Sequence, residues 1–378
     1  MKKLFVFAGV VAAAIFGTSC SKQISVNGEE FTMGSGECIL TVGLGSQGTK
    51  VAAQTVTNEK TIQNVQVYVF RAGEGADNGM LEVAASKGFD TPLNNFTGTY
   101  SGITVKCATG QREVWVVVND SQDRTAISGD GAIKTKTEFL AQVHDLENSN
   151  ATKLLMIGRS NPDNVSPVIT LNEGAQNVNI PVHHMAAAIT LESVINEFSS
   201  PAYQKANTFR LEAAYIINVP GRYNFGESSE PAALAADYWY AKMAAETGAA
   251  RKVLLYDEIG TPSSPAYVNY GGTPYSTPHT FYTYPNNCSL SEDSSWSTRA
   301  TLLVVEASIL YGTSWQKYYY PVVINPTGGL LSNKQYHVNI TVHRPGSLDP
   351  NKPVKFSDMT PVITVTDFED GGTMNPEI

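Results

Sequence analysis

The sequence predicts an all-β protein with two β-sandwich domains. Of its 378 residues only 16% are charged, and the chain contains 31 glycines, 19 prolines and 18 tyrosines, a composition typical of turn-rich extracellular β proteins. Short runs rich in Val, Ile, Tyr and Thr recur between Gly, Pro, Asn and Asp residues, and helical periodicity is nearly absent. Strands at this spacing indicate sandwiches, and the chain is long enough for two hydrophobic cores.

The chain begins with a predicted export signal. Lys2 and Lys3 precede an apolar run over residues 4–16, and small residues lead into Cys20. A charged start, a short apolar stretch and small residues define a signal peptide, and the run is too short to span a membrane comfortably. A cysteine at this point is the bacterial lipoprotein pattern, so we predict residues 1–19 as the signal peptide and Cys20 as the lipid acceptor. An ordinary signal peptide with an incidental cysteine is the alternative.

The first predicted strand of the exported chain covers residues 38–44, and alternate side chains on it can enter a core. The side chains on this inward face are Cys38, Leu40, Val42 and Leu44.

A glycine-containing loop over residues 45–53 follows this strand, and such loops are natural sites of proteolysis. Lys50 is the one basic residue in the loop, so a trypsin-like protease would cut between Lys50 and Val51. The alternative is a first strand followed by an ordinary surface loop.

Strand candidates continue through the rest of the chain, and only residues 136–143 and 232–246 carry short helical patterns. We place the domain boundary near residues 181–185, with an N-terminal sandwich over residues 51–182 and a C-terminal sandwich over residues 183–344. A long, turn-rich segment over residues 224–276 is interpreted as excursions from the second sandwich. The predicted strands are residues 65–70, 103–107, 114–118, 154–157, 168–171, 177–182, 187–191, 210–219, 281–284, 300–310, 316–324 and 336–342.

The C-terminal segment, residues 345–378, is predicted to be a hinge and a detachable strand. Residues 345–353 are rich in Pro, Gly, Asp and Asn and cannot continue a central strand, yet a strand-like run follows over residues 359–368. A terminal strand on a tether suits the completion of another chain's sheet. Residues 345–357 extend to at most about 43 Å, whereas a domain of this size is roughly 30–40 Å across. The strand can therefore reach a neighbour or fold back.

We expect Ile363 and Val365 to be the inward side chains of this strand, with Phe368 as a contact at the rim. A slip of one residue would exchange the two faces, so the other register stays open.

The cysteines do not indicate a disulfide framework or a zinc site. Apart from Cys20, the chain has Cys38, Cys107 and Cys288, and no C-x-x-C spacing occurs. We interpret Cys107 and Cys288 as small buried hydrophobic residues.

No catalytic or cofactor motif stands out, so we predict neither an enzyme nor a cofactor. The motifs of α/β-hydrolases, P-loop proteins, dinucleotide-binding folds and zinc proteases are absent from the sequence. His183 and His184 are adjacent on a predicted strand, so their side chains diverge and a shared metal ion is not expected. The net charge of −9 argues against a nucleic-acid partner. Tyrosines over residues 267–284 are interpreted as cross-strand packing, with a carbohydrate- or protein-binding surface as the alternative.

Several motifs in a fixed order resemble the Bacteroidales fimbrillins of the FimA and Mfa type, also called type V pilins. The resemblance starts at the first strand and its loop and covers nearly the whole chain. The matching segments are residues 62–70 (I-x-N-V-Q-V-Y-V-F), 112–119 (REVWVVVN), 182–190 (VHHMAAAIT), 281–286 (FYTYPN), 317–322 (KYYYPV) and 333–342 (N-x-x-Y-x-V-x-I-T-V).

The resemblance implies two transthyretin-like, Greek-key sandwiches and a maturation step. In this family a protease cuts the loop after the first strand, and the strand is lost with the lipid. The vacated groove then receives a terminal strand from another subunit. Carried over to this chain, residues 20–50 are a removable propeptide, Lys50–Val51 is the scissile bond, and residues 345–378 hold the donor strand. The family usually has arginine where this chain has Lys50.

The resemblance also implies a role and partners. The C-terminal extension favours a structural stalk subunit over a tip subunit, which would support adhesion and biofilm formation. The partners would be other fimbrial subunits, including anchor and tip proteins, and a maturation protease. The lipid would hold the precursor in the outer membrane before release into an extracellular fimbrium. An uncleaved fimbrial anchor, or a surface lipoprotein that binds a carbohydrate or protein ligand, is the alternative.

Overall fold

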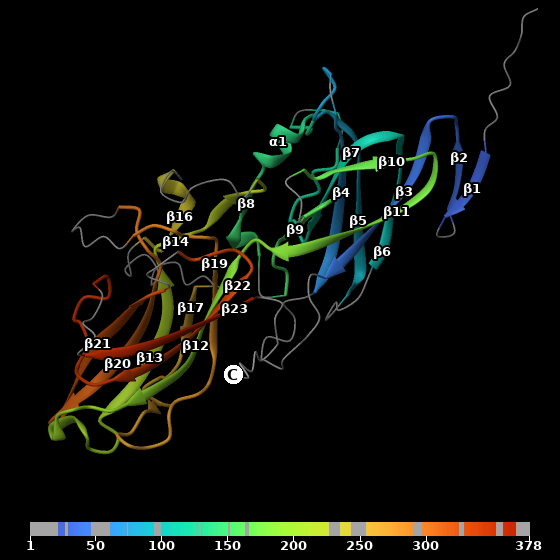
Figure 1. Cartoon of the computed structure of the whole chain (residues 1–378). Helices are drawn as coiled ribbons and strands as arrows, with labels where there is room; N and C mark the ends of the chain where they lie inside the picture. Colours follow the sequence, from blue (N-terminus) through green and yellow to red (C-terminus); the bar gives the residue numbers. More distant parts are fainter. Residues whose placement is uncertain are drawn as a thin grey trace, which may run out of the picture.

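The computed structural model describes fourteen stretches of the chain, which form an elongated, nearly all-β molecule (Figure 1). The prediction of an all-β fold is confirmed, since the described part contains strands, three short 3₁₀ turns and one α-helix. No helix in these stretches is long and apolar enough to cross a membrane. The stretches are residues 22–26, 29–46, 61–73, 75–93, 100–126, 128–129, 131–149, 152–162, 166–226, 235–242, 255–289, 297–324, 329–352 and 358–367.

The N-terminal half is an eight-stranded sheet with the order β5-β4-β7-β9-β11-β3-β6, in which β10 also pairs with β7. A small hairpin of β1 (Lys22–Val26) and β2 (Glu29–Met33) precedes it. The strands are β3 (Glu37–Ser46), β4 (Ile62–Arg71), β5 (Leu81–Leu93), β6 (Tyr100–Ala108), β7 (Gly110–Val118), β9 (Met156–Arg159), β10 (Val168–Leu171) and β11 (Gly174–His184).

This sheet curls so that its two end strands approach each other. Glu82 on β5 accepts a hydrogen bond from the backbone N–H of Ala108 at the end of β6, 2.5 Å away. The curled sheet encloses what we call the N-terminal core, because alternate apolar residues of its strands all point to one interior. That core consists of Cys38, Leu40, Val42, Leu44, Ile62, Val65, Val67, Val69, Ile103, Val105, Cys107, Val114, Val116, Val118, Met156, Leu171, Ile180 and Val182.

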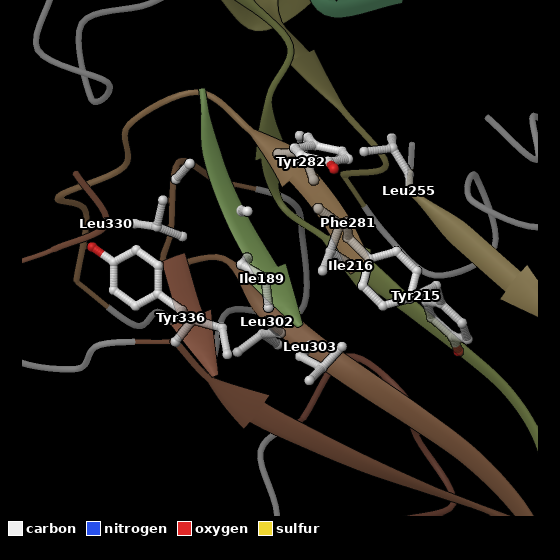
Figure 2. Close-up of a cluster of buried hydrophobic side chains, with 14 of the residues drawn as sticks. Ile189, Tyr215, Ile216, Leu255, Phe281, Tyr282, Leu302, Leu303, Leu330 and Tyr336 are labelled. Carbon is white, nitrogen blue, oxygen red and sulfur yellow. The ribbon is translucent and has the colours of Figure 1, made fainter. Parts of the chain in front are cut away.

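The C-terminal half consists of two sheets packed on each other. One has the order β19-β12-β22-β23, and the other β17-β13-β20-β21 with β18 paired to β13. Figure 2 shows Ile189 and Phe281 of the first sheet against Ile216 and Leu303 of the second. The strands are β12 (Ala187–Asn196), β13 (Phe209–Ile217), β17 (Tyr256–Glu258), β18 (Ala266–Tyr267), β19 (His279–Thr283), β20 (Leu302–Tyr311), β21 (Ser314–Val323), β22 (Lys334–Val342) and β23 (Met359–Asp367).

The two halves share a packed joint. Phe139 of α1 (Lys136–Leu140) contacts Phe225 with ring centroids 5.4 Å apart. In the same region β8 (Val143–Asp145) pairs with β15 (Arg222–Asn224), and the buried His144 is 2.6 Å from the hydroxyl of Tyr284. Nearby, β14 (Val219–Pro220) pairs with β16 (Trp239–Tyr240). The predicted domain boundary stays a prediction, but the connection between β11 and β12 is as short as expected, two buried residues.

The helical patterns yield less helix than the sequence suggests. Thr135 caps α1 and forms a capping box with Glu138, yet the helix ends at Leu140, after five residues. Within the second pattern only Ala236–Tyr238 is helical, as a 3₁₀ turn, in the part that the structure describes. The remaining 3₁₀ turns are Leu146–Asn148 and Pro201–Tyr203.

The two halves repeat one pairing scheme. In the N-terminal half the early strand β3 pairs in parallel with β11 and antiparallel with β6. In the C-terminal half the first strand β12 pairs in parallel with β22 and antiparallel with β19. The strand β9 lies beside β11 in the first scheme, and β23 takes the corresponding place beside β22 in the second. The C-terminal strand therefore completes a position that the other half fills with an internal strand.

Candidate functional site

The strand β3, which contains the predicted first strand, lies inside its sheet rather than at an edge. Its parallel register with β11 runs from Cys38 beside Gly174 to Ser46 beside Val182. On its other side it pairs with β6, with one irregularity between Val42 and Gly43. Both backbone edges of β3 are therefore hydrogen-bonded, and removal of the strand would expose a partner strand on each side.

The predicted inward face of β3 is buried in the N-terminal core. Its four side chains, Cys38, Leu40, Val42 and Leu44, are each 2% exposed or less. Fully burying one aliphatic side chain contributes roughly 1.5–3 kcal/mol, so the three aliphatic ones together contribute on the order of 5–9 kcal/mol. A whole domain is stabilised by about 5–15 kcal/mol. The strand is thus a large part of what stabilises this half.

The other face of β3 carries polar contacts to β6. Lys106 forms an ion pair with Glu37 at 2.7 Å, and the hydroxyls of Thr41 and Thr104 are 3.4 Å apart. The ion pair lowers the pKa of the Glu37 carboxyl. Both groups of the ion pair are partly exposed to solvent, so it contributes little stability. Apolar burial rather than charge holds the strand in place.

The predicted processing residues lie outside the described part of the chain. These are the lipid acceptor Cys20, the predicted cleavage pair Lys50 and Val51, and the predicted rim residue Phe368. Their roles stay predictions.

The C-terminal strand β23 folds back on its own half, one of the two arrangements that its tether permits. It runs antiparallel to β22, from Met359 beside Val342 to Asp367 beside Lys334, and it is the end strand of its sheet in the described region. Two histidines pin it through hydroxyls. Nε2 of His337 is 3.0 Å from Thr366 Oγ1, and Nε2 of His343 is 3.1 Å from Thr360 Oγ1.

The start of the tether is also docked. Ser347 exchanges two backbone hydrogen bonds with Tyr319 of β21, at 2.8 and 2.9 Å. The backbones approach so closely at Gly346 that a Cβ there would lie 2.3 Å from the carbonyl oxygen of Tyr319. Glycine is therefore required at this position, and the part of the tether that is free of this backbone pairing begins after Ser347.

The burial of β23 fades along its length. Met359 is 3% exposed and joins the core, Ile363 is half-buried against it, and Val365 is 45% exposed. These residues share the face that is predicted to point inward. On the opposite face Val362 is 56% exposed. The folded-back strand thus leaves apolar surface in water at two valines.

The tyrosine-rich region is mostly packing. Tyr282 and Tyr284 are buried, whereas Tyr267 and Tyr270 are exposed. One partly exposed aromatic pair, Tyr267 and Trp315, has ring centroids 6.4 Å apart. The guanidinium of Arg210 already covers the Trp315 ring at 4.2 Å, so this surface is occupied by the chain's own side chains.

Acidic and histidine side chains of this structure form local pairs. Asp120 is buried and ion-paired with Arg124 at 2.7 Å, and Asp257 is 2.5 Å from His279. His183 and His184 both lie on β11, where His184 is buried. Among the described residues no group of three or more His, Cys, Asp or Glu side chains could hold a metal ion.

The structure brings together Cys38 and Cys107, which sequence reasoning did not connect. They are directly opposite each other on β3 and β6, and their thiols are hydrogen-bonded. This hydrogen bond lowers the pKa of the Cys38 thiol, whereas the same bond and burial raise the pKa of the Cys107 thiol. No local spacing signals the pair, because it depends on the register of two strands that are far apart in sequence.

The comparisons with known proteins agree with this architecture. A family model described as major fimbrial subunit protein (FimA) matches residues 40–191, from β3 into β12. No curated protein matches the chain. The predicted resemblance to the Bacteroidales fimbrillins is confirmed, and the matched family is one of structural subunits rather than enzymes. The match supports a structural or adhesive role in a fimbria at the cell surface.

Solved structures share the fold over almost the whole chain. A proposed cell adhesion protein from Bacteroides eggerthii is 22% identical, with a TM-score of 0.60, over 88% of this chain and 96% of that one. A FimA fimbrillin from Porphyromonas gingivalis is 16% identical, with a TM-score of 0.56, over 87% and 97%. The tip fimbrial protein Mfa3 from the same species, with a C-terminal truncation, is 13% identical, with a TM-score of 0.51, over 88% and 99%. At these identities the similarity establishes the β-sandwich fold of the fimbrillins.

Proposed function

We propose that this chain is a structural stalk subunit of a cell-surface fimbria that polymerises by donor-strand exchange after a proteolytic cut. The chain would be exported as a lipoprotein precursor held in the outer membrane through Cys20. Cleavage between Lys50 and Val51 would release residues 20–50 with β3, and β23 of another subunit would enter the groove between β11 and β6.

The observation that carries this proposal is the match between the strand to be lost and the strand to be gained. β3 has ten residues and β23 has nine, so the incoming strand is long enough for the groove. A donor that enters in the direction of β3 would restore the parallel pairing with β11 and the antiparallel pairing with β6. An unpaired strand edge with empty apolar pockets is a strong acceptor for such a segment.

Apolar burial supplies a driving force for the exchange. Val362 and Val365 are about half-exposed where β23 folds back. The groove would cover both faces of the strand, as it covers Ile39 and Leu40 of β3, which are fully buried. The strand would lose the contacts of Met359 and Ile363 in its own half, and the gain at the valines and in the groove offsets this loss.

The tether geometry supports exchange with a neighbour. If Ser347 keeps its pairing with Tyr319, the free tether covers residues 348–358. Eleven extended residues span at most about 36 Å, comparable with the width of a domain. The donor would therefore serve the subunit directly next to it, which suits a linear polymer.

The test is the assembly of surface fimbriae by variants of the full chain. Deletion of residues 354–378 should abolish fimbriae under the electron microscope while the protein still folds, because β23 lies at the end of its sheet. Lys50→Ala should retain residues 20–50 in the surface protein. Lys352→Ala, an exposed lysine in the tether, is the control and should mature normally. Fimbriae that persist after the deletion would overturn the donor assignment.

A further inference from the structure

Cys38 and Cys107 form a cross-strand pair between β3 and β6 in the N-terminal core. Cys38 lies near the start of β3 and Cys107 near the end of β6, and the two residues are directly opposite each other. Residues that pair directly across antiparallel strands point to the same face of the sheet. Both side chains enter the N-terminal core and are 0% and 4% exposed. The two thiols therefore start from opposite positions on neighbouring strands and point into the same core.

The geometry of this pair suits a disulfide. Directly opposite residues in antiparallel strands have Cα atoms about 4.5–5.5 Å apart, and disulfides occur at Cα distances of about 4.4–6.8 Å. The backbone therefore needs no large movement to form the bond. Cys288 lies outside the N-terminal core, in the other half, where its N–H donates to Asn286 Oδ1. Cys38 and Cys107 are thus the pair that the described structure offers.

We propose that Cys38 and Cys107 form a disulfide in the exported protein, and that this disulfide ties β3 to the subunit after the proteolytic cut. The covalent loop would run from residue 38 to residue 107 and would contain the Lys50–Val51 bond. Cutting that bond opens the loop but leaves residues 20–50 attached through the sulfur atoms. Reduction of the disulfide then becomes the step that frees the groove. This second part depends on the proposed cleavage, whereas the disulfide itself depends only on the proposed export.

The chemistry is a thiol–disulfide exchange with an external partner. The thiolate of one cysteine attacks the disulfide of an oxidoreductase or a small-molecule disulfide, and a mixed disulfide forms. The second cysteine displaces that partner, which leaves as a dithiol or as two thiols and carries away both electrons and the two protons of the cysteine thiols. Because both cysteines are buried in the fold, the exchange takes place during folding of the exported chain. Oxidising compartments outside the cytoplasm allow such bonds to persist.

The disulfide is tested on the uncut full chain, without reference to cleavage. Surface protein of the Lys50→Ala variant, which should keep residues 20–50, is isolated from cells lysed in an alkylating reagent, digested without reductant and examined by mass spectrometry. The expected result is a peptide that links Cys38 to Cys107 and disappears on reduction, with the thiol of Cys288 alkylated. Alkylation of both Cys38 and Cys107 before reduction would overturn the proposal.

The retention of β3 by the disulfide is tested by following the fragment that contains Cys38 after cleavage. Protein cleaved after Lys50 should keep the fragment that contains Cys38 without reductant and lose it when dithiothreitol is added. Assembly should be absent before reduction and appear after it. If the fragment leaves without reductant in protein that carries the disulfide, the disulfide does not retain β3 and this part of the proposal is wrong. If no cleavage occurs after Lys50, the proposed function fails, whereas the linked peptide still decides the disulfide.

Variants separate the roles of the cysteines. Cys38→Ala and Cys107→Ala should each release the cut strand without reductant, and Cys288→Ala should behave like the unaltered chain. Dithiothreitol treatment of the unaltered chain gives the same information if an alanine variant does not fold.

Discussion

Leu40 links the burial of a single side chain to the stability of the N-terminal half. It is fully buried in the N-terminal core, with β11 on one side of its strand and β6 on the other. Replacing a buried leucine with alanine removes apolar contacts and leaves a cavity, which costs about 2–5 kcal/mol.

We therefore expect Leu40→Ala to lower the free energy of unfolding of the uncut protein by about 2–5 kcal/mol in urea denaturation. Val362→Ala, at an exposed position on β23, is the control and should change it by less than about 0.5 kcal/mol. A loss below about 1 kcal/mol for Leu40→Ala would mean that β3 contributes little to this half.

Ile363 tests the register of the donor strand. It shares the inward face of β23 with Met359, whereas Thr364 points the other way and is exposed. A carboxylate buried in an apolar pocket without a partner is costly, so Ile363→Asp should block fimbria formation. Thr364→Asp is the matched variant on the opposite face and should impair assembly less than Ile363→Asp, because the side chain that it replaces is already polar. Electron microscopy distinguishes the two, and the reverse outcome would place the donor in the register shifted by one residue.

The alternation of residues 38–44 predicts which side chains of β3 point inward, because that pattern is local. The Cys38–Cys107 pair could not be predicted in this way. It depends on which strands are neighbours and on their register, and both are set by packing of the whole sheet. The exposure of Val365 has a similar origin, since it reflects how far the core extends beneath the end of β23.

At the scale of elements, the pairing of β8 with β15 sets the joint between the halves and contains a titratable group. His144 of β8 is buried and 2.6 Å from the Tyr284 hydroxyl. Burial lowers the pKa of His144 to about 4. The ordinary pKa of histidine is about 6.5, so the unfolded chain takes up this proton at a higher pH than the folded one.

The folded protein should therefore lose stability as the pH falls from about 6.5 towards 4, by about 3 kcal/mol from this residue. Urea unfolding at pH 7 and pH 4 measures the loss, and His144→Gln should reduce it because glutamine does not titrate. His343→Gln, at a partly exposed histidine outside the joint, is the control. An equal loss of stability in His144→Gln and in the unaltered chain would show that His144 is not the group responsible.

Some elements escape sequence reasoning for physical reasons. β5 was not among the predicted strands, because its residues include Ala, Ser, Lys and Gly, and it lies partly exposed at one end of its sheet. The short helix α1 ends after five residues, whereas its periodic pattern continues to residue 143, where the chain enters β8 instead. The length of the tether could not decide whether the C-terminal strand folds back on its own half or extends to a neighbouring subunit, since the tether is long enough for both.

In the whole molecule, the proposed assembly connects two strands from opposite ends of the sequence. The early strand β3 lies between β11 and β6 in the N-terminal half, and the last strand β23 lies beside β22 at the end of a sheet in the C-terminal half. Replacing β3 with β23 of another copy would convert a closed subunit into a link in a chain. Such a replacement keeps the existing strand directions when the donor runs parallel to β11, as β3 does.

The most direct test is the identity of the N-terminal residue of subunits taken from fimbriae on the cell surface. Donor-strand exchange after cleavage predicts Val51. This residue would mean that β3 has been cut away and that its groove is open to a donor. An acylated Cys20 would contradict the proposed stalk function, because β3 would still fill the groove. The chain would then be an anchor or a surface lipoprotein.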